Sequence, residues 1–355
     1  ESLIGSLMPG ARVIEVRPLA PDSGTGQGDA TAKVAGYGLP LRVRVVTKDS
    51  LEMCLVFRTS SADDFGHDRP SDRAQGMLLA YDTFPRIPRH IQAMDVGAVL
   101  ADGRVLSLRD AMEHYLLTTY APGTLYAADL RRIAREGEPT ALDLERCDAL
   151  AQYLLQLHQP VGCRPAVYRR AIRDLIGHGE GIFGIVDGYL PNAPAAPPER
   201  LQAIEQRCAD WRWRLRGKEE RLVRMHGDFH PFNVIFDQGT NFSLLDASRG
   251  CEGDRADDVM CMAVNFVFFA LEHPNSWAKG LGVLWRRFWR IYLEGTKDAE
   301  LLQACPPYLA WRGLVLACPA FYPAMTPGAR DRLLSFVERA LAHGKLEPSW
   351  AEELF

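Results

Sequence analysis

Short runs of alternating apolar and polar residues occupy the first third of the chain. Alternation with a period of two predicts strands that bury one face. We expect such strands at residues 12–19, in extended segments within 30–46, at 51–59, around 93–100 and near 105–106. Residues 71–81 favour a helix. The amino-terminal part is therefore predicted to be rich in strands.

Beyond residue 125 the spacing changes, and apolar residues recur every three or four positions. Leu150, Leu154 and His158 share one face of the stretch 143–158, which is the spacing of an amphipathic helix. We interpret His158 as a packed or capping residue at the end of that helix. Further helices are expected at residues 128–136, 199–224 and 259–271. Together the two parts predict an α+β fold with a mostly helical carboxy-terminal lobe.

The composition is that of an ordinary globular protein. Of the 355 residues, 47% are hydrophobic and 24% are charged. A chain of this length suits two lobes better than one small core. The formal net charge is −4 and no basic tract stands out. Neither nucleic acid nor an anionic membrane is therefore an expected partner.

The eight cysteines contain no C-x-x-C pair and form no His/Cys cluster at zinc spacing. They are expected to be reduced thiols, which are typical of a cytoplasmic protein. The sequence shows neither a secretory leader pattern nor a run of about 18 apolar residues. We therefore expect a cytoplasmic chain that is neither secreted nor membrane-spanning.

The candidate chemistry lies in residues 225–233, Met-His-Gly-Asp-Phe-His-Pro-Phe-Asn, which contain the spacing H-x-D-x-x-x-x-N. A short strand at 234–236 and a turn follow, and a second strand then ends at Asp246. An antiparallel return of this kind brings Asp246 back beside Asp228 and Asn233.

Two carboxylates and an amide in this order suit phosphoryl transfer from a nucleotide. Asp228 is expected to orient the acceptor hydroxyl and to take its proton. Asn233 and Asp246 are expected to hold Mg²⁺, which prefers oxygen ligands. His226 is expected to support the loop. The alternative is that Asp228 caps a turn and that Asp246 ends a strand at the surface.

These motifs, together with Gly253-Asp254 and Asp258 downstream, resemble those of the aminoglycoside phosphotransferase and choline kinase family of small-molecule kinases. The resemblance implies a bilobal, protein-kinase-like fold. It divides the chain into a nucleotide-binding lobe at residues 1–117, a hinge at 118–124 and a helical lobe with the catalytic loop and substrate site at 125–355. It also implies that Asp258 is a structural buttress under the catalytic loop.

The expected nucleotide contacts lie upstream of the catalytic loop. Gly24, Gly26 and Gly28 belong to a glycine-rich loop between two strands, and such a loop can fold over a triphosphate because glycine permits close backbone approach. A flexible hairpin without a ligand is the alternative. Thr119 and Tyr120 end an apolar extended run whose place resembles the hinge of the family, although an internal strand followed by a Pro-Gly turn also fits.

The third strand departs from the family, because Arg58 stands where a lysine is usual. Arginine can bind phosphate through two parallel hydrogen bonds, so the role can survive with a different geometry. The helix that follows has no glutamate to pair with the cation. Asp72 and Gln75 are the candidates to pair with Arg58.

We therefore expect an ATP-dependent O-phosphotransferase that acts on a hydroxyl of a small molecule. Aminoglycosides, sugars, amino alcohols and amino acids all remain open as acceptors. The expected cofactors are ATP, or GTP, and Mg²⁺, and the protein is expected to be a monomer or homodimer. The alternative is a nucleotide-binding regulatory pseudokinase without phosphotransfer, which Arg58 and the absent glutamate would suit.

Overall fold

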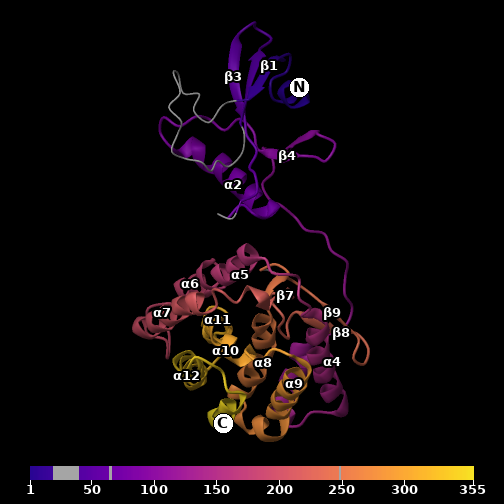
Figure 1. Cartoon of the computed structure of the whole chain (residues 1–355), viewed down its shortest axis with the longest axis vertical. Helices are drawn as coiled ribbons and strands as arrows, with labels where there is room; N and C mark the ends of the chain where they lie inside the picture. The colour runs from indigo at the N-terminus through magenta and orange to yellow at the C-terminus, as the bar shows by residue number, and fades with distance from the viewer. Residues whose placement is uncertain (19–39, 64–65, 248) are drawn as a thin grey trace. The chain divides into compact units, whose positions relative to one another are not determined.

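The computed structural model describes residues 1–18, 40–63, 66–247 and 249–355. The chain divides into two compact units, Glu1–Thr118 and Thr119–Phe355 (Figure 1). The first unit is rich in strands and the second is mostly helical. The α+β fold of two lobes that the hydrophobic pattern predicted is therefore confirmed.

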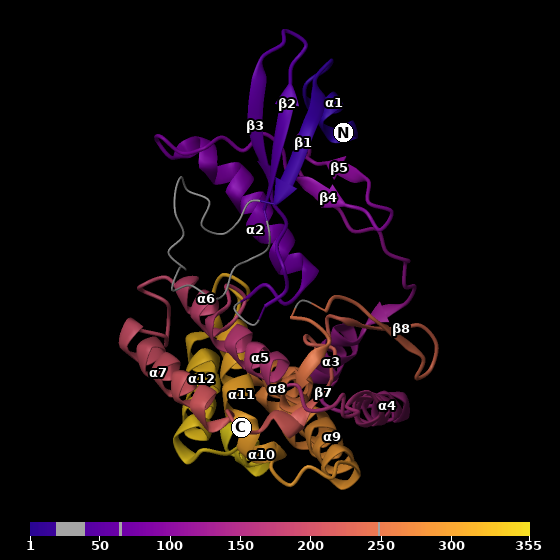
Figure 2. The same ribbon diagram turned by 45° about the horizontal axis from the view of Figure 1, so that its top comes forward.

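The first unit is built on a three-stranded antiparallel sheet of order β1-β2-β3, whose strands lie side by side in Figure 2. Its strands are β1 (Arg12–Pro18), β2 (Leu41–Val46) and β3 (Glu52–Phe57). The charged residues of β1 and β2 meet on one face, where Glu15 accepts from Arg42 at 3.4 Å and from Arg44 at 3.5 Å. Opposite charges on neighbouring strands favour this register.

The remaining elements of the first unit are short. They are α1 (Ser2–Leu7), α2 (Pro70–Thr83), the turn η1 (Phe84–Arg86), β4 (Gly97–Val99) and β5 (Val105–Ser107). Asp72 stabilises the start of α2, because its carboxylate accepts the backbone N–H of Arg69 at 2.8 Å. No side chain of α2 is buried. The strands β4 and β5, which lie where two strands were expected, pair antiparallel.

The apolar run at residues 115–120 forms no strand. Tyr115 is 92% exposed, and Leu116 and Leu117 are each 88% exposed. The alternative of an internal strand is therefore wrong for this segment, since apolar composition alone does not supply a hydrogen-bonding neighbour.

The second unit consists of helices and two small sheets. The helical segments are α3 (Tyr126–Glu136), α4 (Ala141–Leu157), α5 (Pro165–Gly177), α6 (Ile182–Asp187), α7 (Pro198–Arg214), α8 (Arg255–Leu271), α9 (Gly282–Gly295), α10 (Leu301–Ala304), α11 (Pro306–Ala317) and α12 (Pro327–His343), with the short turns η2 (Glu219–Arg221), η3 (Pro274–Ser276), η4 (Trp277–Leu281) and η5 (Pro348–Leu354). The strands are β6 (Thr124–Leu125), β7 (Leu222–Arg224), β8 (Val234–Phe236), β9 (Phe242–Leu244) and β10 (Glu252–Asp254).

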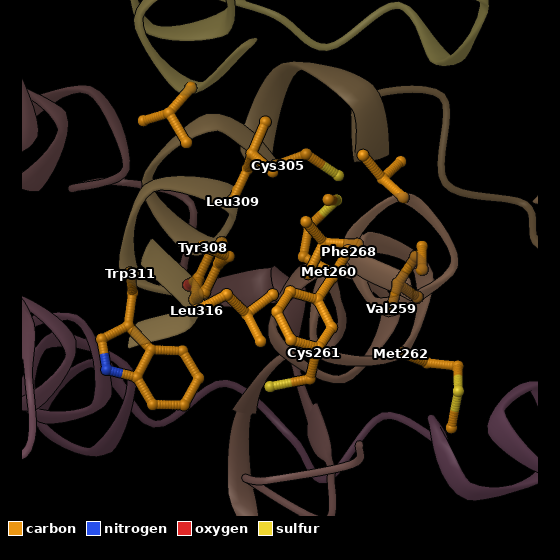
Figure 3. Close-up of a cluster of buried hydrophobic side chains, with 14 of the residues drawn as sticks. Val259, Met260, Cys261, Met262, Phe268, Cys305, Tyr308, Leu309, Trp311 and Leu316 are labelled. Carbon is orange, nitrogen blue, oxygen red and sulfur yellow. The ribbon is translucent and has the colours of Figure 1, made fainter. Parts of the chain in front are cut away.

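Helix α8 is the centre of this unit. Every residue from Ala256 to Leu271 is buried, and the neighbouring helices α9 and α11 contact it (Figure 1). Side chains of α8 such as Met260 and Cys261 face Tyr308 and Leu309 of α11 (Figure 3). A mostly apolar helix that is buried on all sides is enclosed by its neighbours. It therefore provides a rigid base for the loops at its amino-terminal end.

One expected helix is shorter than predicted. The charged stretch at 199–224 continues as helix only to Arg214, and the chain then enters η2 and β7. Arg221 explains the change, because its buried guanidinium pairs with Asp254 at 2.6 Å and with Asp298 at 2.7 Å. These tertiary ion pairs override the local helix propensity.

The two small sheets position the candidate site. β7 pairs with β10, while β6, β8 and β9 form an antiparallel sheet in that order. Gly123 leads into β6 with a φ of +128°, and a Cβ atom there would lie 2.2 Å from the carbonyl oxygen of Phe236. Only glycine permits this close approach of the chain to β8.

Candidate active site

The stretch with the spacing H-x-D-x-x-x-x-N connects β7 to β8. Gly227 has a φ of +85°, and a Cβ atom at this position would lie 2.6 Å from the carbonyl oxygen of Gly250. The backbone N–H of Met225 also donates to the carbonyl of Cys251 at 3.0 Å. The loop is therefore tied to the segment that precedes β10, and its glycine is required by the backbone.

Asp228 is held from several sides. The Asn233 Nδ2 donates to the carbonyl oxygen and to the Oδ2 of Asp228, both at 3.1 Å. The His230 Nε2 lies 3.2 Å from the same Oδ2. The Phe232 N–H donates to His230 Nδ1 at 3.2 Å, so the ring proton is on Nε2 and points to the carboxylate. These bonds fix the orientation of the aspartate.

A buried arginine completes the surroundings of Asp228. Arg312, on α11, places its Nη1 3.4 Å from Asp228 Oδ1, and its side chain is only 5% exposed. The two residues are 84 positions apart in the chain. Arg312 was not predicted from the sequence, where a lone arginine within an apolar helix is the available signal.

The electrostatics keep Asp228 ionised. Burial would raise its pKa, but the hydrogen bond from His230 and the positive charge of Arg312 lower that pKa to about 2. Burial also lowers the pKa of His230, which favours the neutral ring. The carboxylate is therefore a fixed, charged acceptor near neutral pH that can orient a hydroxyl group.

Asp258 supports the loop from beneath. Its carboxylate accepts the backbone N–H of His226 at 2.7 Å and that of Gly227 at 2.9 Å. The expected role of Asp258 as a buttress is confirmed.

The position of His158 is also confirmed, because it follows the last residue of α4 and is packed in the core. Its Nε2 lies 3.2 Å from Asp258 and its Nδ1 lies 2.6 Å from the Tyr292 hydroxyl. The sequence analysis did not foresee that His158 would contact the buttress. His226 itself accepts the Asp228 N–H at its Nδ1 at 3.3 Å, and its supporting role in catalysis stays a prediction.

Asn233 directly precedes β8, and Asp246 lies two residues after the end of β9. β8 pairs with β9, and the Leu245 N–H donates to the carbonyl of Asn233 at 2.9 Å. Asp246 is exposed, with a φ of +40° that aspartate tolerates better than most residues. The return strand therefore ends beside the loop, as expected from the spacing.

These two residues fit a magnesium site. The Asn233 Nδ2 is committed to Asp228, which leaves its Oδ1 as an acceptor, and Asp246 contributes an exposed carboxylate. Within the described residues no group of three or more His, Cys, Asp or Glu could hold a metal. Magnesium commonly uses one or two protein oxygens and takes its other ligands from water and phosphate, so two residues suffice.

A second buried arginine lies in the same neighbourhood. Arg249 pairs with Asp257 at 2.5 Å and lies 3.6 Å over the ring of Trp311. Its charge also lowers the pKa of Asp228, after the larger effects of His230 and Arg312. Sequence reasoning did not single out Arg249.

The residues expected to contact the nucleotide form fewer interactions in the described part of the chain than those of the catalytic loop. Gly24, Gly26 and Gly28 lie outside the described residues. Arg58 directly follows β3, is exposed, and makes no hydrogen bond or ion pair with the part of the chain that the structure describes. The structure therefore does not form the pairs with Asp72 or Gln75 that the sequence suggested.

Thr119 and Tyr120 stand at the start of the second unit, in a segment without helix or strand, and Tyr120 is 89% exposed. Their role in binding an adenine edge stays a prediction.

Comparison with known proteins gives one family. The model of the phosphotransferase enzyme family matches residues 86–294, which is more than half of the chain. This match includes the loop, Asp246 and Asp258. None of the curated proteins matches the chain significantly.

Several solved structures are similar at low identity. A glucosamine kinase is 18% identical with a TM-score of 0.36, and the match covers 66% of this chain but only 59% of that one. An ethanolamine kinase from Plasmodium vivax is 13% identical, with coverage of 90% and 82% and a TM-score of 0.35. A choline kinase from Cryptosporidium parvum Iowa II is 11% identical, with coverage of 99% and 94% and a TM-score of 0.33. At these TM-scores the likenesses decide nothing about the acceptor.

Proposed function

The chain belongs to the phosphotransferase enzyme family, and on that premise we propose that it transfers the terminal phosphoryl group of ATP to a hydroxyl group of a small molecule. It is a kinase with an alcohol group as acceptor. The observation that carries the proposal is the ionised carboxylate of Asp228, which Asn233, His230 and Arg312 hold in one orientation.

The residues of the loop have distinct tasks in this reaction. The Asp228 carboxylate accepts a hydrogen bond from the hydroxyl group of the acceptor. This bond directs the hydroxyl oxygen toward the terminal phosphorus. As the new P–O bond forms and the bond to the bridging oxygen breaks, the hydroxyl proton passes to Asp228 and ADP leaves. A pKa of about 2 suits a late proton transfer, after which the proton is lost readily to water.

Asn233 and Asp246 would hold the magnesium ion, which neutralises charge on the phosphates when it is bound. The remaining residues of the loop position these groups. His226 and Gly227 are held by Asp258, so the backbone does not have to reorganise during the reaction.

We assign the nucleotide side to the amino-terminal unit. In this proposal residues 1–117 bind the nucleotide, Arg58, Gly24, Gly26 and Gly28 contribute to phosphate binding, and residues 118–124 act as the hinge. Thr119 and Tyr120 would offer backbone groups to the base. GTP is the competing nucleotide for the same contacts.

The regulatory alternative gains nothing from the family match. Arg58 and the absence of a glutamate on α2 motivated it. Asp228, Asn233 and Asp246 are all present, however. A protein that only binds nucleotide does not need a carboxylate that is oriented to accept a hydrogen bond from a substrate hydroxyl.

A turnover assay tests the proposal. Purified protein with ATP and Mg²⁺ is offered a panel of sugars, amino alcohols, amino acids and aminoglycosides, and ADP release is measured with and without each acceptor. We expect release that depends on one acceptor class, a phosphate ester as product, and loss of both when Mg²⁺ is chelated. Nucleotide binding without ADP release on any acceptor would support the regulatory alternative instead.

A further inference from the structure

A cavity of about 290 Å³ lies next to the catalytic loop within the carboxy-terminal unit. Its walls include the rings of Phe232, Phe268, Phe269 and Tyr322 and the side chains of Arg131 and Arg135. Phe232 belongs to the loop itself, immediately before Asn233. The loop that contains Asp228 therefore also forms part of the wall of this cavity.

The rings are arranged as a continuous wall. Phe232 stacks on Phe269 at a centroid distance of 6.0 Å, and Phe269 contacts Phe268 at 5.1 Å. Tyr322 meets Phe268 at 4.8 Å. Such a wall offers flat apolar contact to a ligand, as small-molecule sites usually do.

The catalytic loop connects this wall to Asp228, because the backbone N–H of Phe232 donates to His230 Nδ1 at 3.2 Å. The His230 ring, which donates to Asp228, also lies 5.7 Å from the ring of Phe232. A molecule in the cavity would thus lie in the neighbourhood of the carboxylate that orients the hydroxyl.

The charges at the cavity favour an anion over a polycation. Arg131 lies over Phe232 at 5.2 Å and over Phe269 at 5.9 Å. Across the described residues, neither Arg131 nor Arg135 pairs with a carboxylate. The single carboxylate of the lining, Glu272, accepts the backbone N–H of Thr326 at 3.1 Å. A ligand with several ammonium groups would need more carboxylates than this cavity offers.

We propose that this cavity holds the acceptor and that the acceptor combines an apolar, preferably flat, body with an anionic group such as a carboxylate, which Arg131 and Arg135 bind. The inference rests on the proposed phosphotransfer and names its acceptor class. Guanidinium groups suit an acceptor of this kind, since they stack on aromatic rings and bind carboxylates through paired hydrogen bonds.

Direct binding of three matched probes tests the inference without requiring turnover. The probes are para-carboxyphenylethanol, phenylethanol and para-aminomethylphenylethanol, which share the ring and the hydroxyl and differ in charge. Calorimetry on the full chain should show that the carboxylate probe binds about tenfold or more tightly than the amine probe, because hydrogen bonds to charged groups are worth that much. The neutral alcohol should lie between them.

Two arginine variants localise the effect. Arg131→Gln should lower affinity for the carboxylate probe about tenfold and should change the affinity for phenylethanol much less. Arg290→Gln removes the same charge from an exposed residue of α9 outside the cavity and should bind like the wild type. Both positions are exposed, so neither change threatens folding.

The inference is overturned if the carboxylate probe does not bind, if the amine binds as tightly, or if both variants lose affinity equally. ADP release measured on the same samples keeps the two hypotheses apart. Phosphorylation of the amine probe in preference to the carboxylate would leave the proposed function intact and reject the acceptor class. The expected order of affinities without any ADP release would instead count against phosphotransfer, and it would leave only the preference of the cavity for an anionic ligand standing.

Discussion

Asp228 in the catalytic loop and Arg58, which directly follows β3, carry the two charges that matter most to the proposed reaction, and their surroundings differ. Asp228 accepts hydrogen bonds from Asn233 and His230 and lies beside the buried Arg312. Arg58 is exposed and makes no hydrogen bond or ion pair within the described ranges. In the proposed reaction the acceptor side is thus organised in advance, whereas the contact of Arg58 with the phosphates stays a prediction.

Burial differs between the two units in the same way. In the first unit the buried apolar side chains among the described residues are Ile4, Val45 and Val96. In the second unit the whole of α8 from Ala256 onward is buried beneath the loop. Few buried contacts imply low local stability, so the first unit is expected to change more when a nucleotide binds.

The largest effect is expected from Asp228→Asn. The amide keeps the shape of the side chain but cannot accept the hydroxyl proton, so kcat should fall by about 10²- to 10⁴-fold. The dissociation constant of ATP should stay nearly unchanged, because this carboxylate acts on the acceptor. The matched control is Asp237→Asn in the exposed turn after β8, which should keep full turnover. Near-normal turnover of Asp228→Asn would remove Asp228 from the proposed role.

Removal of the buttress should come next. Asp258→Ala leaves the N–H groups of His226 and Gly227 and the ring of His158 without an acceptor in a fully buried place. Breaking such a buried charged network costs about 3 kcal/mol of the free energy of unfolding. Denaturant unfolding measures this loss, and kcat should fall with it because the loop loses its support. Unchanged stability would mean that water replaces the carboxylate.

Asp246→Ala tests whether the exposed carboxylate at the end of β9 holds the metal. Loss of a metal ligand should weaken magnesium-dependent ATP binding by about tenfold or more. Even mutation of a residue that only hydrogen-bonds a metal ligand typically lowers metal affinity by about tenfold or more. Calorimetry with and without Mg²⁺ decides the question. The same ATP affinity in both proteins, at every Mg²⁺ concentration, would reduce Asp246 to a surface residue.

Arg312→Gln should shift the pH dependence of turnover. The positive charge helps to lower the pKa of Asp228 to about 2, so the wild type should show no acid limb from this group between pH 5 and pH 8. Without the charge the pKa rises, and the acid limb should move upward by about 1 pH unit or more. A profile of kcat/KM against pH measures this shift. Arg290→Gln, which removes the same charge from an exposed position of α9 outside the cavity, is the control.

The catalytic loop could be predicted from the sequence because its residues lie close together along the chain. Asp228 and Asn233 lie five positions apart, and the hairpin that returns Asp246 is short. Arg312 could not be foreseen in the same way, because it reaches Asp228 across 84 residues through the packing of α11 on α8. The end of α7 at Arg214 was missed for the same reason, since the ion pair of Arg221 with Asp254 is tertiary.

The smallest effect is expected at Arg58. If its guanidinium binds the phosphates, Arg58→Ala should weaken ATP binding several-fold, about the worth of one charge-assisted hydrogen bond. Arg58→Lys should restore only part of the affinity, because the ammonium lacks the planar fork. Arg58 has no protein partner within the described residues, so neither change should alter the free energy of unfolding.

Calorimetry with ATP and denaturant unfolding of the same samples separate a ligand contact from a structural one. An alanine variant with unchanged ATP affinity would move the phosphate contact to another cation. Arg42 and Arg44 are already committed to Glu15 on the sheet, which leaves Lys48 in the turn between β2 and β3 as the nearest described candidate.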